Sequence, residues 1–179
     1  MKRIIALLLS VVLALSLVAC GDNASSNQGN SDSSADTIRI GVMNCFTGGM
    51  AAYGEHEMRG IELAHKQFPE VNGHPIELVQ ADNKSDAVES ANAAQRLIEK
   101  EKCSIILGTY GSAMCMAASE SVMNGQVPTI TGGATNANIT KGNPYYYRAC
   151  FLDSLQTPIC AQYCYNDQGY KTAGMIYEI

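Results

Sequence analysis

Residues 37–81 decide the fold class, and they read TIRIGVMNCFTGGMAAYGEHEMRGIELAHKQFPEVNGHPIELVQA. The opening segment 37–44 (TIRIGVMN) is rich in β-branched residues and predicts a buried strand. From Glu55 onward, apolar residues recur at intervals of three, three and four, which predicts a helix closed by Pro69. The apolar stripe of that helix consists of Met58, Ile61, Ala64 and Phe68. Residues 75–81 (PIELVQA) then alternate as in a second strand.

The rest of the chain continues the alternation of strand and helix. Asp86 is placed to cap a helix, with Glu89 three residues later as its partner in a capping box. The further expected elements are helix 86–98, strand 104–109, helix 112–123, strand 127–131, an extended piece at 145–150, helix 156–165 and strand 172–177. Strands separated by helices pair in parallel through right-handed crossovers. We therefore expect an open α/β sheet with helices on both faces.

Three loops are candidates for a ligand site. In open α/β sheets, ligands bind at the carboxyl ends of the strands, near the point where the strand order reverses. This rule selects loops 45–54, 109–112 and 132–136, which are rich in Gly and small polar residues. Ser112 opens a helix, so its hydroxyl and the free N–H groups of that turn could hold a carboxylate or phosphate. The alternative is that Ser112 merely caps its own helix.

The loop after the expected strand 127–131 offers both donors and acceptors. Gly132 and Gly133 expose backbone N–H and C=O groups, and the Thr135 hydroxyl both donates and accepts. Such a set suits a zwitterion, whose carboxylate needs donors and whose ammonium needs acceptors; a plain turn is the alternative. Tyr53, in the first loop, could form an apolar wall of the site or be an ordinary surface aromatic.

The composition indicates a globular domain, and the motifs that are missing favour binding over catalysis. The 179 residues are 46% hydrophobic and carry a formal charge of −5, without a block of Lys or Arg that would indicate a nucleic-acid partner. The stretch from His56 to Gly60 begins like the HExxH zinc motif but has Gly where the second His belongs. The sequence also lacks a GxSxG nucleophile elbow and a Walker-type phosphate loop. We expect no catalysis, metal or cofactor.

The beginning of the chain has the pattern of an export signal. Residues 1–19 combine Lys2 and Arg3 with a long apolar run, as in a secretory signal peptide. The four residues that end at Cys20, Leu-Val-Ala-Cys, resemble the bacterial lipobox, which implies a lipid on the Cys20 thiol; a chance Cys is the alternative. Residues 20–36 are rich in Ser and Asn and predict a flexible tether. The expected location is extracytoplasmic, anchored to the cell membrane by lipid.

Three stretches carry a resemblance to the branched-chain amino-acid binding proteins of bacterial ABC transporters. They are 38–64 (IRIGVMNCFTGGMAAYGEHEMRGIELA), 108–119 (GTYGSAMCMAAS) and 128–140 (PTITGGATNANIT). The resemblance implies the type I periplasmic-binding-protein fold, in which two lobes close around a ligand. It further implies delivery of a branched-chain or related amino acid to an ABC permease, and a monomer is expected.

The resemblance also implies roles for individual residues. Ser112 would bind the ligand carboxylate, and Tyr53 would pack on the ligand. The backbone at Gly133 and Ala134, together with the Thr135 hydroxyl, would bind carboxylate and ammonium. A ligand-sensing ectodomain of the same fold, and a binder of an amide or urea-type solute, are the alternatives. The side-chain preference is not predicted.

The resemblance divides the mature chain into two parts. Residues 37–150 would form an incomplete first lobe, and residues 151–179 would begin a second, truncated lobe, so that half of a binding cleft is expected. Six cysteines follow Cys20. Their even number in an exported protein suggests disulfides. Most of them lie in apolar runs, however, and Cys160 and Cys164 share a helix face, so we expect buried free thiols.

Overall fold

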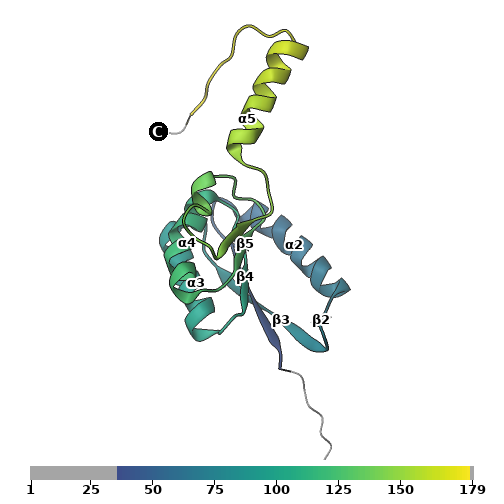
Figure 1. The fold of residues 1–179 in the computed structure, drawn as a ribbon, viewed down its shortest axis with the longest axis vertical. Helices are drawn as coiled ribbons and strands as arrows, with labels where there is room; N and C mark the ends of the chain where they lie inside the picture. The colour runs from purple at the N-terminus through teal and green to yellow at the C-terminus, as the bar shows by residue number, and fades with distance from the viewer. Residues whose placement is uncertain (1–35, 178–179) are drawn as a thin grey trace, which may run out of the picture. The chain divides into compact units, whose positions relative to one another are not determined.

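The computed structural model describes residues 36–177, so the predicted signal peptide, Cys20 and all but the last residue of the tether lie outside the described part. The strands are β1 (Ile38–Asn44), β2 (Glu70–Val71), β3 (His74–Asp82), β4 (Ile105–Leu107), β5 (Thr129–Thr131) and β6 (Tyr146–Arg148). The helices are α2 (Ala51–Gln67), α3 (Ala87–Gln95), α4 (Ser112–Gly125) and α5 (Asp153–Gln162), with shorter turns η1 (Arg96–Lys100), η2 (Ala137–Ile139) and η3 (Tyr163–Asp167). Figure 1 shows their arrangement.

The strands form one sheet in the order β2-β3-β1-β4-β5-β6. Apart from β2, neighbouring strands are parallel, which confirms the predicted open α/β sheet. The chain runs from β1 to β3 on one side and then crosses to β4 on the other, so the strand order reverses beside β1. Antiparallel β2 was not predicted. It is joined to β3 by Asn72 and Gly73, whose φ angles of 51° and 81° suit a tight hairpin turn.

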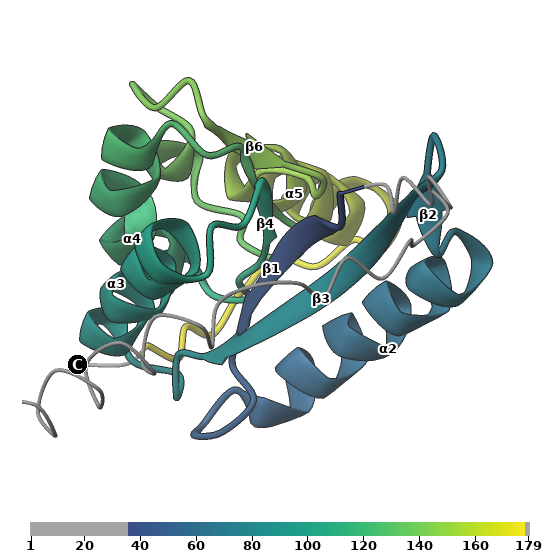
Figure 2. The same ribbon diagram turned by 90° about the horizontal axis from the view of Figure 1, so that it is seen from below.

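Helices α3 and α4 lie together on one face of the sheet, and α2 lies on the other (Figure 2). The core between the sheet and α3 and α4 includes Met43, Leu97, Ile106 and Ala118, all fully buried. Burying a side chain as large as Leu97 or Ile106 contributes about 1.5–3 kcal/mol. This packing fixes the carboxyl ends of β1 and β4 in position relative to each other. A ligand site at that edge of the sheet requires such fixed positions.

The local signals at helix ends were mostly correct. The Asp86 side chain accepts a hydrogen bond from the Glu89 N–H at 3.0 Å, as the capping box predicts. Helix α4 begins at Ser112, as expected, whereas α2 begins at Ala51, four residues before the predicted start at Glu55. Among the described residues, none of the helices is both long and apolar enough to span a bilayer.

Two expectations for the last part of the chain were wrong. The segment 172–177, predicted as a strand, is not a strand and is exposed along its whole length. A strand forms through hydrogen bonds to a neighbour, and no other described strand lies beside this segment. Helix α5 is likewise exposed throughout. All six described cysteines are free, but Cys160 and Cys164 are exposed on this part of the chain, contrary to the expected burial.

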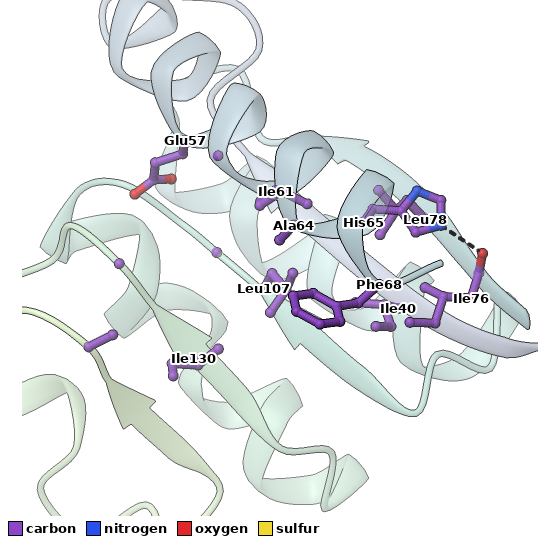
Figure 3. A pocket seen from close by; sticks show the side chains of 14 residues that line it. Ile40, Glu57, Ile61, Ala64, His65, Phe68, Ile76, Leu78, Leu107 and Ile130 are labelled. Atoms are coloured by element: carbon purple, nitrogen blue, oxygen red, sulfur yellow. Dashed lines mark hydrogen bonds between the residues drawn. The ribbon is translucent and has the colours of Figure 1, made fainter. Parts of the chain in front are cut away.

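An apolar groove of about 440 Å³ lies between α2 and the sheet face that it covers (Figure 3). The helix contributes Ile61, Ala64 and Phe68 to the groove, and the sheet contributes Leu107 and Ile130, among other residues. Phe68, the last residue of the predicted stripe, is 68% exposed. The apolar stripe of α2 therefore faces the sheet, but its last residue, Phe68, remains exposed to solvent.

Candidate functional site

The three predicted loops meet at the edge of the sheet formed by the carboxyl ends of β1, β4 and β5, where the strand order reverses. The first loop, after β1, is held by Asp82 at the end of β3. The Asp82 carboxylate accepts hydrogen bonds from the N–H groups of Phe46, Thr47 and Lys84 and, at 2.6 Å, from the Thr47 hydroxyl. Desolvation raises the pKa of Asp82, but these hydrogen bonds outweigh it and the net pKa is lowered.

A chain of buried hydrogen bonds connects the loops that follow β3, β4 and β5. The Asn83 amide donates to the Thr109 hydroxyl at 2.7 Å, and the Thr131 hydroxyl donates to the Thr109 carbonyl at 2.8 Å. The Thr131 oxygen in turn accepts the Ala134 N–H at 3.1 Å. Asn83, Thr109 and Thr131 are all fully buried. Because each polar group has a partner, this network fixes the second and third predicted loops relative to each other.

Tyr53 lies against a second aromatic residue, Tyr110. Their rings are stacked, with centroids 4.3 Å apart and an interplanar angle of 2°. Tyr110 also packs on Gly133, where an added Cβ would lie 2.4 Å from the ring. One residue from each of the three loops thus meets at this point. The Tyr110 ring occupies the space that a side chain at position 133 would need, so only Gly fits there.

Ser112 is the first residue of α4, and it does not cap its own helix. Its hydroxyl oxygen instead accepts a hydrogen bond from the Asn136 N–H at 3.3 Å. A hydroxyl that accepts in this way keeps its own proton free to donate. Ser112 therefore joins the second and third loops while still offering a donor beside the N-terminus of a 14-residue helix.

The other predicted residues follow directly after β5. Gly133 and Thr135 are half-buried, whereas Ala134 is only 1% exposed. The Ala134 N–H donates to Thr131, and its carbonyl accepts from the Cys150 thiol at 3.4 Å. The structure thus brings Tyr53, Ser112 and Gly133 to one edge of the sheet, where Ala134 is buried. Among the predicted backbone contacts, Gly133 is the more accessible.

Glu57 belongs to the same cluster, although it was not among the residues predicted for the site. It is four residues after Tyr53 on α2, so the two side chains lie on the same side of the helix. Its Oε1 atom is buried without a hydrogen-bond partner among the described residues. Burial raises the pKa of Glu57, and the Asn44 side chain lowers it by a smaller amount. The i, i+4 spacing from Tyr53 was the signal in the sequence that could have identified Glu57.

Tyr110 was also missed, although it lies inside a predicted loop. Burial, followed by the proximity of Tyr53 and Glu57, raises the pKa of Tyr110. An aromatic residue in a loop otherwise built from Gly, Ser and Thr was the available signal.

The comparisons with known proteins agree with this geometry. The sequence profile of the family described as periplasmic binding protein matches residues 37–178. The chain belongs to this family. Its relatives include an amino acid binding protein of Pseudomonas aeruginosa, which is 29% identical over 99% of this chain. The chain spans 44% of the length of that relative.

Two solved structures share the fold. The branched-chain amino acid transporter substrate binding protein LivJ of Streptococcus pneumoniae, in complex with isoleucine, matches with a TM-score of 0.72 and 33% identity, over 75% of this chain and 39% of that one. A solute binding protein of an ABC transporter from Rhodopseudomonas palustris, in complex with 3,4-dihydroxybenzoic acid, matches with a TM-score of 0.71 and 27% identity, over 74% and 37% of the two chains. Membership of a family of binding proteins confirms the fold and the broad class that the sequence predicts.

Proposed function

We propose that residues 37–150 form the first ligand-binding lobe of an ABC-importer substrate-binding protein that captures a branched-chain or related amino acid. Residues 151–179 would begin the second lobe, which would close over the ligand. The observation that carries this proposal is the meeting of Tyr53, Ser112 and Gly133 at the point where the strand order reverses. The relatives and structural neighbours that bind amino acids support it.

The chemistry of the edge suits an amino acid. The free proton of Ser112 and the N-terminus of α4 provide donors for a carboxylate. The Gly133 carbonyl and the Thr135 hydroxyl provide acceptors for an ammonium, and Tyr53 provides apolar surface for the side chain. Each charge-assisted hydrogen bond contributes about 1.5–3 kcal/mol. The protein's role is recognition and delivery to a permease, with no bond made or broken.

Thermal unfolding of the complete polypeptide that contains these residues tests the proposal. Each amino acid of a panel is added at a hundred times its expected Kd, which stabilises a folded binder by about 2.7 kcal/mol. We expect leucine, isoleucine or valine to raise the melting temperature. If no amino acid raises it, the amino-acid proposal fails. Residues 37–179 alone are expected to bind weakly, because they hold one side of the cleft.

A carboxylic acid without an ammonium is the second candidate ligand. The observation that favours it is the structural neighbour in complex with 3,4-dihydroxybenzoic acid, whose fold matches as well as that of the isoleucine-bound neighbour. Adding hydroxybenzoates to the same panel separates the two classes. A rise in melting temperature with hydroxybenzoates alone would favour this second candidate.

The proposal includes attachment to a membrane outside the cytoplasm. Export would remove residues 1–19, and a lipid on Cys20 would then hold a monomeric protein near its permease. The lipobox-like sequence before Cys20 supports this arrangement. Replacing Cys20 by Ser should release the protein from the membrane fraction. Retention of the C20S variant with membranes, to the same extent as wild type, would argue against lipid attachment.

A further inference from the structure

Glu57 is a half-buried acid at the candidate site, and its Oε1 atom is buried with its hydrogen-bonding capacity unused. Its Oε1 has no partner among the described residues and lies 3.0 Å from the position that a Cβ on Gly133 would take. The corresponding distance for Gly132 is 3.5 Å. The carboxylate therefore lies against the backbone of the loop proposed to hold the ligand. Figure 3 shows it at one end of the groove, beyond Ile61 on the same helix.

No cation neutralises this carboxylate among the described residues, since none of their ion pairs includes Glu57. The side chain that acts on it is the amide of Asn44 at the end of β1. The carboxylate in turn contributes to the raised pKa of the Tyr110 phenol after β4 and of the Cys115 thiol on α4, in both cases after burial. The Cys115 thiol already donates to the Thr109 carbonyl at 3.3 Å. These neighbours are neutral, so among the described residues the negative charge of the carboxylate is unbalanced.

An unbalanced buried charge acts on any charge brought close to it, because little water lies between them to screen it. A ligand group on the Gly133–Thr135 backbone would be separated from Glu57 mainly by the loop itself. A positive group there is stabilised by the carboxylate, and it stabilises the carboxylate in return. A ligand without a positive group does not stabilise the charged form of the Glu57 carboxylate.

We propose that Glu57 is the specificity residue that selects ligands with a positive charge: its carboxylate, whose Oε1 atom is buried, stabilises a cationic group on the Gly133–Thr135 backbone without touching it. The inference rests on the proposed function and deepens it. It assigns the choice between an amino acid and a simple carboxylic acid to one residue beneath the loop. It also predicts that binding of a cationic ligand and ionisation of Glu57 favour each other.

The sign of the pH dependence follows from burial. Burial raises the pKa of Glu57, so the charged form is lost sooner than in an exposed Glu as the pH falls. Affinity for an amino acid should therefore fall as Glu57 takes up its proton. Affinity for a carboxylic acid without an ammonium should not fall with it. His56 and His65 lie on the same helix, and both must be kept unchanged in the comparison.

The test uses the complete polypeptide and two probes with the same carbon skeleton, L-leucine and 4-methylpentanoate, which lacks the ammonium. Glu57→Gln keeps the shape of the side chain and removes its charge. Glu55→Gln is the matched control, because Glu55 lies on the same helix, is exposed and pairs with Arg59 at 2.6 Å. Both variants retain the two histidines. Calorimetric titrations from about pH 5.5 to 8 give the affinity of each probe.

In wild type and E55Q, we expect the ratio of leucine affinity to 4-methylpentanoate affinity to rise with pH. In E57Q, the ratio at neutral pH should be smaller by roughly tenfold or more, the size expected for an opposite charge a few ångströms away, and its pH dependence should be lost. An unchanged ratio in E57Q would overturn the inference. So would an equal loss of affinity for both probes, which would mean that Glu57 only supports the loop.

A measurement on wild type covers the case in which E57Q does not fold. The side-chain carboxyl of Glu57 is titrated by carbon NMR with and without L-leucine. Leucine should lower the pKa of Glu57, and an unchanged pKa in the saturated complex would refute the coupling. Failure of wild type to bind any amino acid would instead refute the proposed function, so the two failures are distinguishable.

Discussion

The rings of Tyr53 and Tyr110 lie face to face, with 4.3 Å between their centroids and 2° between their planes. Tyr53 comes from the first turn of α2 and Tyr110 from the loop before α4, so the stack joins the two sides of the point where the strand order reverses. A stacked pair contributes about 0.5–1.5 kcal/mol beyond the area that it buries.

A double-mutant cycle should detect this stack. Replacing Tyr53 and Tyr110 by Ala, singly and together, should give a coupling energy of about 0.5–1.5 kcal/mol in the free energy of unfolding, measured with urea. Tyr110→Phe should retain most of the coupling because it keeps the ring. Strictly additive effects of the two Ala substitutions would show that the rings do not support each other.

Two glycines of α2 should respond in opposite ways to Ala. A Cβ at Gly54 would lie 2.0 Å from the Cys45 carbonyl oxygen, whereas nothing lies within 4 Å of a Cβ at Gly60. Gly54→Ala should force α2 away from the first loop and destabilise the fold by about 1–3 kcal/mol. Gly60→Ala should stabilise it by about 0.5–1 kcal/mol, since Ala is the better helix former. Urea unfolding of both variants measures this, and equal effects would contradict the close contact of Gly54.

The carboxylate of Asp82 should make stability depend on pH. Its pKa is lowered in the folded state, so its contribution is present above the pKa of the unfolded chain and is lost as the pH falls toward the folded value. Asp82→Asn should cost about 1.5–3 kcal/mol at neutral pH, where hydrogen bonds to a charged acceptor are lost. The variant should also lose less stability than wild type on acidification. Glu62→Gln, at an exposed position of α2, is the control, and parallel acid profiles for wild type and D82N would count against the prediction.

Ser112→Ala should weaken ligand binding by about tenfold or more, because it removes the proposed donor to the ligand carboxylate and leaves the Asn136 N–H without its acceptor. Ser121→Ala, further along the same helix, should leave affinity unchanged. Calorimetric titration of the complete polypeptide with L-leucine gives both values. If the two variants bind as tightly as wild type, the ligand does not use the N-terminus of α4.

The cysteines should divide into two classes by reaction with a thiol reagent. Under native conditions, Cys160 and Cys164 should react quickly, whereas Cys45, Cys103 and Cys115 are buried and should be protected. Burial raises the pKa of Cys103 and Cys115, which further lowers their reactivity. After unfolding without reductant, all six described cysteines should be titratable. A smaller number would show that disulfides form in the protein as it is made.

Structural features that depend on residues close together in the sequence could be predicted. Features that depend on contacts between residues far apart in the sequence could not. The β1 strand and the Asp86 cap follow from patterns a few residues long, and both were correct. The segment 172–177 has a strand-like composition, but a strand also needs a partner, and its own sequence does not show whether one is present.

The same distinction applies to the candidate site. Position at the ends of strands was enough to select the loops that contain Tyr53, Ser112 and Thr135. The i, i+4 spacing placed Glu57 on the Tyr53 side of the helix, but the burial of its Oε1 atom and the contact of Tyr110 with Gly133 depend on segments far apart in the chain, which the spacing of residues does not reveal. Both residues were missed for that reason.

The hydrogen bonds that run from Asn83 through Thr109 and Thr131 to Ala134 have a thermodynamic consequence. Because the loops are already fixed by internal partners, a ligand need not order them, and little conformational entropy is lost on this side of the cleft when it binds. A larger part of the free energy of each contact between ligand and loop then contributes to the affinity. In the proposed two-lobed protein, the entropic cost of recognition therefore falls mainly on the motion that brings the two lobes together.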